Sequence, residues 1–259
     1  MDHKIKADSL VILFLIMVQA VSLVIALDFT SQEIELVEGG AGVETSILFF
    51  ILIIFATILL MAIIKLNISK YLYIFTDYFG LFFISLFIVS SVLENTIYGL
   101  VAASALTLIK YVGREKSVVG LLSSFILCAG IASIIGMTFG PVPLIMLLLL
   151  LSIYDFVAVK KTKHMIRMAE DVIKEKGPQL LTFSSKDEEI VIGLADIIFP
   201  SALFVSVYIY EGLAVSLLTS LASIIGLILM FRRPLDEGMP AIPFISLGIV
   251  GYLIGILIL

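Results

Sequence analysis

Apolar residues run along this chain in long blocks that short polar segments separate, with no amphipathic periodicity inside the blocks. A helix rises 1.5 Å per residue, so crossing about 30 Å of hydrocarbon takes about 20 residues, and most of the blocks are near this length. The pattern predicts an all-α membrane protein, a polytopic bundle of transmembrane helices. We place nine spans, at residues 10–27, 46–64, 72–93, 95–109, 118–138, 141–159, 190–210, 212–231 and 241–259.

One connection, residues 160–189, is long enough to have structure of its own. Its apolar residues recur at helical spacing up to Gly177-Pro178 and predict a short interfacial helix, whereas "QLLTF" at 179–183 is too short for a span and fits a strand or part of a lid. A solvated tether with a surface helix is the alternative. The chain thus divides into a six-helix part (1–159), a cytoplasmic loop (160–189) and a three-helix part (190–259). The helically spaced residues are Met165, Met168, Ala169, Val172 and Ile173.

Charged residues predict the side of the membrane on which each end lies. If the N-terminus is cytoplasmic, nine alternating crossings put all 16 Lys and Arg residues on the cytoplasmic side and only acids, among them Glu33, Glu94 and Glu211, in the opposite loops. The positive-inside rule predicts this partition, so we expect a cytoplasmic N-terminus and an external C-terminus. The net charge of −5 is divided between the two sides and indicates no nucleic-acid partner.

Composition narrows the chemistry that is available. The chain is 61% hydrophobic and 14% charged, and its single cysteine, Cys128, can form neither an internal disulfide nor a cysteine metal cluster. The two histidines, His3 and His164, fall in cytoplasmic segments, which excludes an H-E-x-x-H zinc pair and a membrane Ser-His dyad. We therefore expect no metal and no cofactor. The first apolar block lacks a small-residue cleavage signature and is interpreted as a retained helix.

Three acids fall inside or at the margin of the predicted spans: Asp77, Asp155 and Asp196. Asp155 interrupts "LLLLLSIYDFVAVKK" at 147–161. A carboxylate at membrane depth costs roughly 2.5 to 3.5 kcal/mol, so its presence indicates a functional site. For Asp77 we expect a hydrogen bond inside the bundle, with a proton or water path as the alternative.

Asp155 and Asp196 are predicted to lie at the same depth. Asp155 comes five residues before Lys160 near the end of one helix, and Asp196 comes seven residues after Glu189 on the next helix, which runs in the opposite direction. Both lie about 7 to 11 Å below the cytoplasmic charges, so the carboxyls can meet if the two helices pack together. Two carboxyls that share a proton cannot both ionise: the ionised one can take a proton from water while the protonated one polarises a carbonyl, as in aspartic proteases.

Two short motifs accompany the acids. "GLAD" at 193–196 removes side-chain bulk before Asp196, which permits close approach of a helix or a substrate backbone, although an ordinary helix contact explains the small residues equally well. "MPAIPF" at 239–244 opens the last predicted span on the cytoplasmic side. Its prolines suit a plain helix start, and they also suit irregular backbone beside a water-filled cavity.

In this order and spacing, "YD" at 154–155, "GLAD" and "PAIP" at 240–243 resemble the motifs of the presenilin and signal peptide peptidase family of intramembrane aspartyl proteases, and the short loops look most like the archaeal homologues. The resemblance covers the nine-span plan and implies that Asp155 and Asp196 are catalytic. Ala195 stands where the family has a second glycine and Ile242 where it has leucine, which places substrate preference in question. The residues that the resemblance implies in shaping the site or binding substrate are Tyr154, Gly193, Leu194, Ala195, Pro240, Ala241, Ile242 and Pro243.

We therefore predict an aspartic endopeptidase in the cell membrane of a prokaryote, an archaeon by the resemblance, that cleaves transmembrane segments of other proteins within the lipid bilayer. The topology and the family analogy predict a preference for substrates with an external N-terminus, cut in the cytoplasmic half of their span. A proton- or cation-coupled transporter or channel is the first alternative, since membrane carboxylates mark such paths too, but no clear repeat is visible. An aspartyl prepilin peptidase is the second. The sequence leaves the oligomeric state open.

Overall fold

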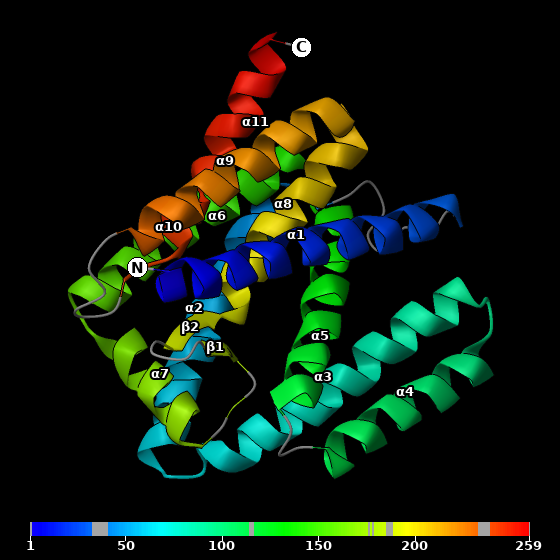
Figure 1. Ribbon diagram of the computed structural model, residues 1–259, viewed down its shortest axis with the longest axis vertical. Helices are drawn as coiled ribbons and strands as arrows, with labels where there is room; N and C mark the ends of the chain where they lie inside the picture. Colours follow the sequence, from blue (N-terminus) through cyan, green and yellow to red (C-terminus); the bar gives the residue numbers. More distant parts are fainter. Residues whose placement is uncertain are drawn as a thin grey trace.

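The computed structural model describes residues 2–32, 41–113, 117–175, 177, 179–184, 189–232 and 239–258. Apart from one small hairpin, its regular elements are helices (Figure 1). The helices are α1 (Asp2–Ser31), α2 (Val43–Lys65), α3 (Ser69–Val92), α4 (Thr96–Val112), α5 (Ser117–Thr138), α6 (Pro141–Lys160), α7 (His164–Lys174), α8 (Leu194–Glu211), α9 (Leu213–Phe231), α10 (Ile242–Ile245) and α11 (Leu247–Ile258).

Among the described residues, seven helices are long and apolar enough to cross a membrane: α1, α2, α3, α5, α6, α8 and α9. Two further predicted spans correspond to shorter apolar helical stretches, Thr96–Val112 and Ile242–Ile258. An all-helical, multi-pass membrane protein is therefore confirmed. The nine-span plan and the side on which each terminus lies stay predictions.

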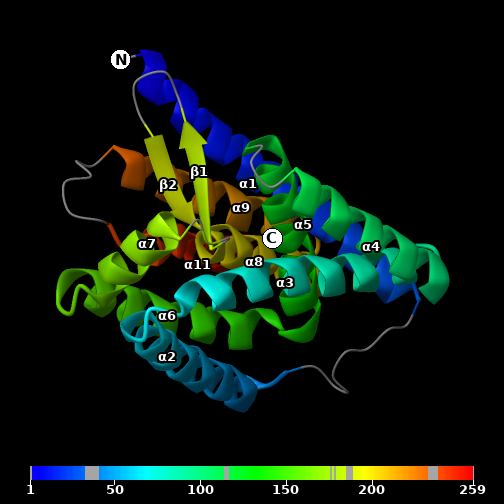
Figure 2. The same cartoon turned by 90° about the horizontal axis from the view of Figure 1, so that it is seen from below.

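Helix α8 lies at the centre of the bundle, and every residue from Ile197 to Val207 is buried. It packs on α1, α5 and α9, and it also contacts α6, α10 and α11. The α3 and α4 helices form a pair at one side of the molecule, while α2 lies along α6 and leaves most of its surface exposed (Figures 1 and 2). A helix that is apolar on all sides is expected either to be buried in protein or to face lipid. In this chain α8 is the most buried of the long helices, and α2 is the most exposed.

The first residues of the predicted 190–210 span form a strand, which corrects that prediction. Strands β1 (Leu180–Ser184) and β2 (Glu189–Gly193) pair antiparallel, with Leu181 opposite Ile192 and Phe183 opposite Ile190. These four side chains are buried, whereas Thr182 and Val191 between them are exposed. Apolar residues at every second position mark a half-buried strand, so α8 begins only at Leu194. The expectation of a strand at 179–183 is confirmed.

The last predicted span is not one continuous helix. The single turn α10 ends at Ile245, and α11 begins at Leu247 after a turn at Ser246. The Ser246 N–H and hydroxyl both donate to the Ile242 carbonyl, at 2.8 and 2.7 Å, and a serine that bonds back in this way often bends a helix. The predicted 241–259 span is therefore corrected to a short helix, a break and a second helix that packs on α9.

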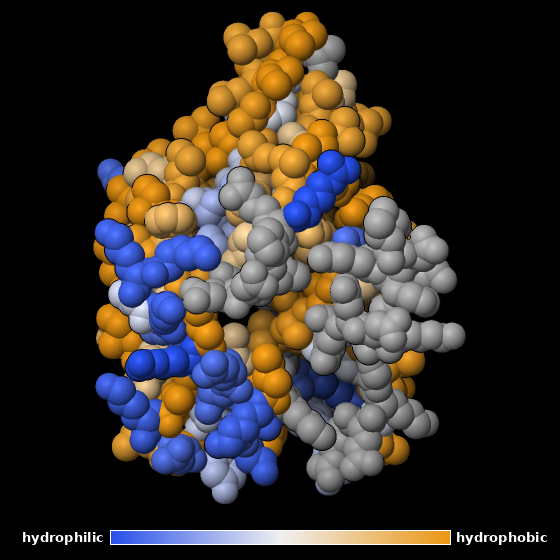
Figure 3. Space-filling model, turned by 60° about the vertical axis from the view of Figure 1, so that its left-hand side comes forward, coloured by the Kyte–Doolittle hydropathy of each residue, from blue (hydrophilic) through white to orange (hydrophobic). Residues whose placement is uncertain are grey.

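The short helix predicted between Lys160 and Gly177 is present as α7; its interfacial position stays a prediction. Val172 is buried and Met165, Met168 and Ala169 are partly buried, whereas Ile173 is exposed. The Tyr73 hydroxyl donates to Asp171 at 2.9 Å and ties α7 to α3. The end of the molecule on which α7 lies gathers hydrophilic side chains, while most of the remaining visible surface is hydrophobic (Figure 3). This polarity fits one aqueous end on a bundle that is otherwise in lipid.

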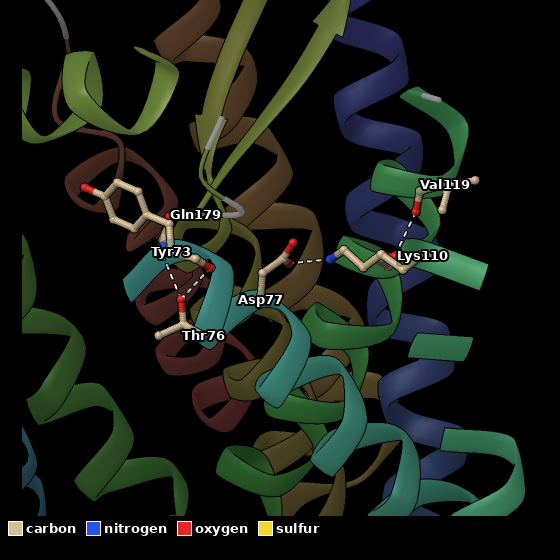
Figure 4. Close-up of polar contacts among 7 residues, drawn as sticks. Tyr73, Thr76, Asp77, Lys110, Val119 and Gln179 are labelled. Carbon is tan, nitrogen blue, oxygen red and sulfur yellow. Dashed lines mark hydrogen bonds and ion pairs between the residues drawn. The ribbon is translucent and has the colours of Figure 1, made fainter. Parts of the chain in front are cut away.

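Asp77 on α3 makes an ion pair with Lys110 on α4, and the two side chains point toward one another (Figure 4). The hydrogen bond expected for Asp77 inside the bundle is thus present, with a cation as its donor. Lys110 was predicted in a cytoplasmic loop, but α4 continues to Val112 and the lysine side chain is only 8% exposed. Its aliphatic stem can pack against apolar surface while its ammonium meets a carboxylate.

Candidate active site

Asp155 lies near the C-terminal end of α6 and is buried. The helix begins at Pro141, where a missing N–H costs nothing, and runs through eight consecutive leucine, isoleucine and methionine positions before it reaches the acid. One carboxylate oxygen of Asp155 accepts a hydrogen bond of 3.2 Å from the backbone N–H of Ile242. A buried carboxylate needs such partners, and this one is supplied by the "PAIP" segment.

Asp196 is the third residue of α8 and is partly buried. Its Oδ2 accepts the backbone N–H of Gly193 at 3.1 Å. An acid at this position commonly caps a helix N-terminus and interacts favourably with the helix dipole, so Asp196 has a structural role whether or not it is catalytic. Pro200, which has no N–H, cannot donate to the Asp196 carbonyl four residues earlier.

The two aspartates lie on helices that pack together: α6, α8 and α10 contact one another pairwise, and Asp155 acts electrostatically on Asp196. Each carboxyl accepts a hydrogen bond from a backbone N–H. Acid and base catalysis by one pair requires two carboxyls close enough to share a proton, and these two helices are the elements that would bring them to that distance.

The residues that precede Asp196 are placed beside it. Gly193 ends β2, and a Cβ built on it would lie 3.0 Å from Asp196 Oδ2, so any side chain here would press on the carboxyl. The Leu194 N–H donates to the Gln179 carbonyl at 2.9 Å and extends the hairpin pairing to the start of α8. Ala195 is exposed, so a larger side chain at this position would project from the start of α8 next to the acid.

The "PAIP" segment contacts the other aspartate. Pro240, Ala241 and Ile242 are buried and Pro243 is partly buried, at the start of α10. Because Ile242 is the first residue of α10, its N–H has no acceptor within that helix, and it donates to Asp155 instead. The structure thus brings the segment to the acid by a backbone contact, which leaves the identity of the Ile242 side chain free to differ from leucine.

The side chain of Tyr154 has different partners from that of its neighbour Asp155. Its hydroxyl makes a 2.9 Å hydrogen bond with His164 Nε2, and its ring packs edge-on against Phe50 at 6.3 Å between centroids. His164 Nδ1 contacts the Thr162 hydroxyl at 2.5 Å. Burial lowers the pKa of the His164 imidazole below its usual value, which favours the neutral ring that can accept from one hydroxyl and donate to the other.

Three residues at the site were not singled out from the sequence: His164, which holds Tyr154, and Ser152 and Ser246, whose hydroxyls lie 2.7 Å apart beside the aspartate pair. Ser152 could have been found, because a residue three positions before Asp155 shares its helix face. Nothing in the sequence pairs it with Ser246. Within the described part of the chain, no group of three or more His, Cys, Asp or Glu side chains could hold a metal ion.

Comparison with known proteins supplies the family. A sequence profile described as "Signal-peptide peptidase, presenilin aspartyl protease" matches residues 11–259. Two solved structures of a presenilin family intramembrane aspartate protease, in different space groups, share the fold: one at 22% identity with a TM-score of 0.70, covering 96% of this chain and 98% of that one. The other matches at 25% identity with a TM-score of 0.69 and covers 96% of both chains. No curated protein matches by sequence. Since the profile spans nearly the whole chain, the protein belongs to the signal-peptide peptidase and presenilin family of aspartyl proteases.

Proposed function

We propose that this protein hydrolyses peptide bonds inside transmembrane segments, with Asp155 and Asp196 as the catalytic pair. Family membership makes it an aspartic endopeptidase embedded in the membrane, and it does not favour a transporter, a channel or a prepilin peptidase. The observation that carries the residue assignment is the meeting of two intramembrane carboxyls from adjacent helices, each held by a backbone N–H. Placing two carboxylates at membrane depth costs several kcal/mol, so such a pair is expected only where the protein uses it.

The reaction needs only water and the two acids. The ionised carboxyl takes a proton from water as the water oxygen bonds to the carbonyl carbon, while the protonated carboxyl gives its proton to the carbonyl oxygen. The tetrahedral intermediate then collapses: the carbon–nitrogen bond breaks, the nitrogen receives the proton that came from water, and the intermediate's hydroxyl returns its proton to the other carboxyl. The pair is regenerated in its starting protonation state.

The substrate must present an extended peptide, because a helix hides its amides in its own hydrogen bonds. The stretch from Gln179 to Ala195 and the "PAIP" segment flank the acids, and both offer backbone groups that can hold an unwound strand. On this proposal the nine-span topology places the N-terminus in the cytoplasm, and substrates with an external N-terminus are preferred. An archaeal origin stays a prediction.

The test is replacement of each aspartate by asparagine. Asp155→Asn and Asp196→Asn each keep an oxygen that can accept the N–H of Ile242 or Gly193, so both proteins should fold and neither should cleave a reporter transmembrane substrate. Glu211→Gln at the far end of α8 makes the same chemical change outside the site and should remain active. Proteolysis retained by either aspartate variant would refute the assignment. The double variant should be no worse than either single one.

A further inference from the structure

A chain of three hydrogen bonds leaves α6 at Ser152 and returns to it at Asp155. The Ser152 and Ser246 hydroxyls lie 2.7 Å apart, the Ser246 hydroxyl donates to the Ile242 carbonyl at 2.7 Å, and the Ile242 N–H donates to Asp155 at 3.2 Å. Residues 152 and 155 are one turn apart on the same helix face. The backbone of Ile242 is therefore held at its carbonyl through one residue of α6 and at its N–H by another.

The three bonds have one direction. The single hydroxyl proton of Ser246 is used on the Ile242 carbonyl, so Ser152 must be the donor to Ser246. The Ile242 carbonyl belongs to the peptide bond with Pro243, and the Ile242 N–H belongs to the peptide bond with Ala241, so the two bonded groups are joined through the Ile242 Cα. Fixing the carbonyl through the serines therefore limits the positions open to the N–H that reaches the Asp155 carboxyl.

We propose that Ser152 and Ser246 are positioning residues that hold the "PAIP" backbone against Asp155, an inference that rests on the proposed role of Asp155 in catalysis. The break between α10 and α11 is part of this arrangement, because Ser246 occupies it and uses its hydroxyl there. Neither serine touches the reacting atoms. They act through the Ile242 N–H, which fixes one oxygen of Asp155 and leaves the other free to face Asp196 and water.

The predicted consequence is a loss in turnover rather than in substrate binding. Ser152→Ala removes the first bond, loosens the Ile242 N–H and should lower kcat about 5-fold, as expected for one net hydrogen bond, with KM changed less than 2-fold. Ser246→Ala removes two bonds and should lower kcat by at least as much. Because both act through one chain, the double variant should be no slower than Ser246→Ala alone. Ser152→Thr keeps the hydroxyl and should restore most of the rate.

The experiment measures kcat and KM for cleavage of a reporter transmembrane substrate in detergent, with the unfolding temperature of each variant. Ser133→Ala is the matched control, since Ser133 is a fully buried serine on α5 that donates only to Gly130 of its own helix. It should leave kcat unchanged. Multiplicative losses in the double serine variant, a wild-type kcat in Ser152→Ala, or an equal loss in the control would each overturn the proposal. Asp155→Asn is run alongside: if it cleaves, the proposed function fails, and if it is inactive while Ser152→Ala is normal, only the positioning role fails.

Discussion

Gly226 on α9 lies directly against the backbone of α10, so replacing it with alanine should displace the segment that contacts Asp155. A Cβ built on Gly226 would lie 1.9 Å from the Phe244 carbonyl oxygen and 2.7 Å from its carbonyl carbon. Carbon and oxygen atoms approach to about 3.3 Å, so α10 would have to move by about 1.4 Å. A backbone atom cannot swing aside as a flexible side chain can.

Gly226→Ala should have a small effect on the free energy of unfolding and a large effect on the cleavage rate. Inserting a methyl group into packed helices costs about 1 to 3 kcal/mol, and the better helix propensity of alanine returns up to ~1 kcal/mol, so the free energy of unfolding should fall by only about 0 to 2 kcal/mol. A misplacement of about 1 Å near catalytic groups can cost ~100-fold in rate. We therefore expect a protein that folds but cleaves on the order of 100 times more slowly.

The assay combines thermal unfolding in detergent with initial rates on a reporter transmembrane substrate. Gly120→Ala on α5 is the control for helix propensity, because a Cβ there meets nothing within 4 Å, and it should be active and at least as stable as the wild type. Gly251→Ala would place its Cβ 2.4 Å from the Leu218 carbonyl oxygen and should loosen α11 from α9 without pressing on α10. If Gly226→Ala cleaves at the wild-type rate, or if Gly251→Ala is equally inactive, α10 does not need its observed position for catalysis.

Four further predictions concern other parts of the molecule. Ala195→Leu should block cleavage by filling the exposed position beside Asp196, whereas Ala195→Gly should maintain or raise it; a harmless leucine would contradict the close approach proposed there. One reporter segment reconstituted in both orientations should be cut preferentially with its N-terminus outside, read from product ends by mass spectrometry, and equal cutting would refute the orientation. Lys110→Met should lower the free energy of unfolding by about 3 kcal/mol by leaving Asp77 unpaired, and adding Asp77→Leu should recover most of the loss; if it does not, the ion pair is not the cause. Burial lowers the pKa of His164, so its neutral form contributes stability that is fully present above about pH 6.5 and is lost as the pH falls through the lowered pKa of the folded protein. His164→Gln should therefore show a smaller decrease in unfolding temperature between pH 7 and pH 5 than the wild type. Identical decreases in the two proteins would contradict this.

Some features of the site could be predicted because their signals are local. The depth of Asp155 follows from counting residues back from Lys160 along α6, since the helical rise is constant. The same count does not apply to Asp196, because Glu189–Gly193 is a strand. The amphipathic helix α7 follows from periodic apolar residues among charges, and the strand beginning at Leu180 from a short apolar run that no span could use. The start of α8 was placed too early because "EIVIG" is as apolar as a helix, and only its pairing with β1 makes it a strand.

Other features depend on contacts between distant residues. Lys110 looked like a loop cation until α3 placed Asp77 beside it, and the break at Ser246 is not visible in an apolar segment that reads as one helix. His164 carries no signal of its own for the same reason, and Ser152 carries only its position on the Asp155 face of α6. Each makes a hydrogen bond whose partner is set by how α7 or α10 packs, and packing is not encoded in periodicity.

The sequence by itself determined the class of the protein, since block length and charge placement reflect how much apolar surface lipid can accept and which loops stay in water. It also predicted that Asp155 lies at membrane depth, because depth along one helix depends only on the residue count. Only the tertiary structure decided that the helices of Asp155 and Asp196 pack together, and that the N–H groups of Gly193 and Ile242 donate to the two carboxyls, one from each flanking segment. The positions of these groups depend on how α6, α8 and α10 pack, because close contacts between helices select one arrangement among the many that are open to equally apolar helices.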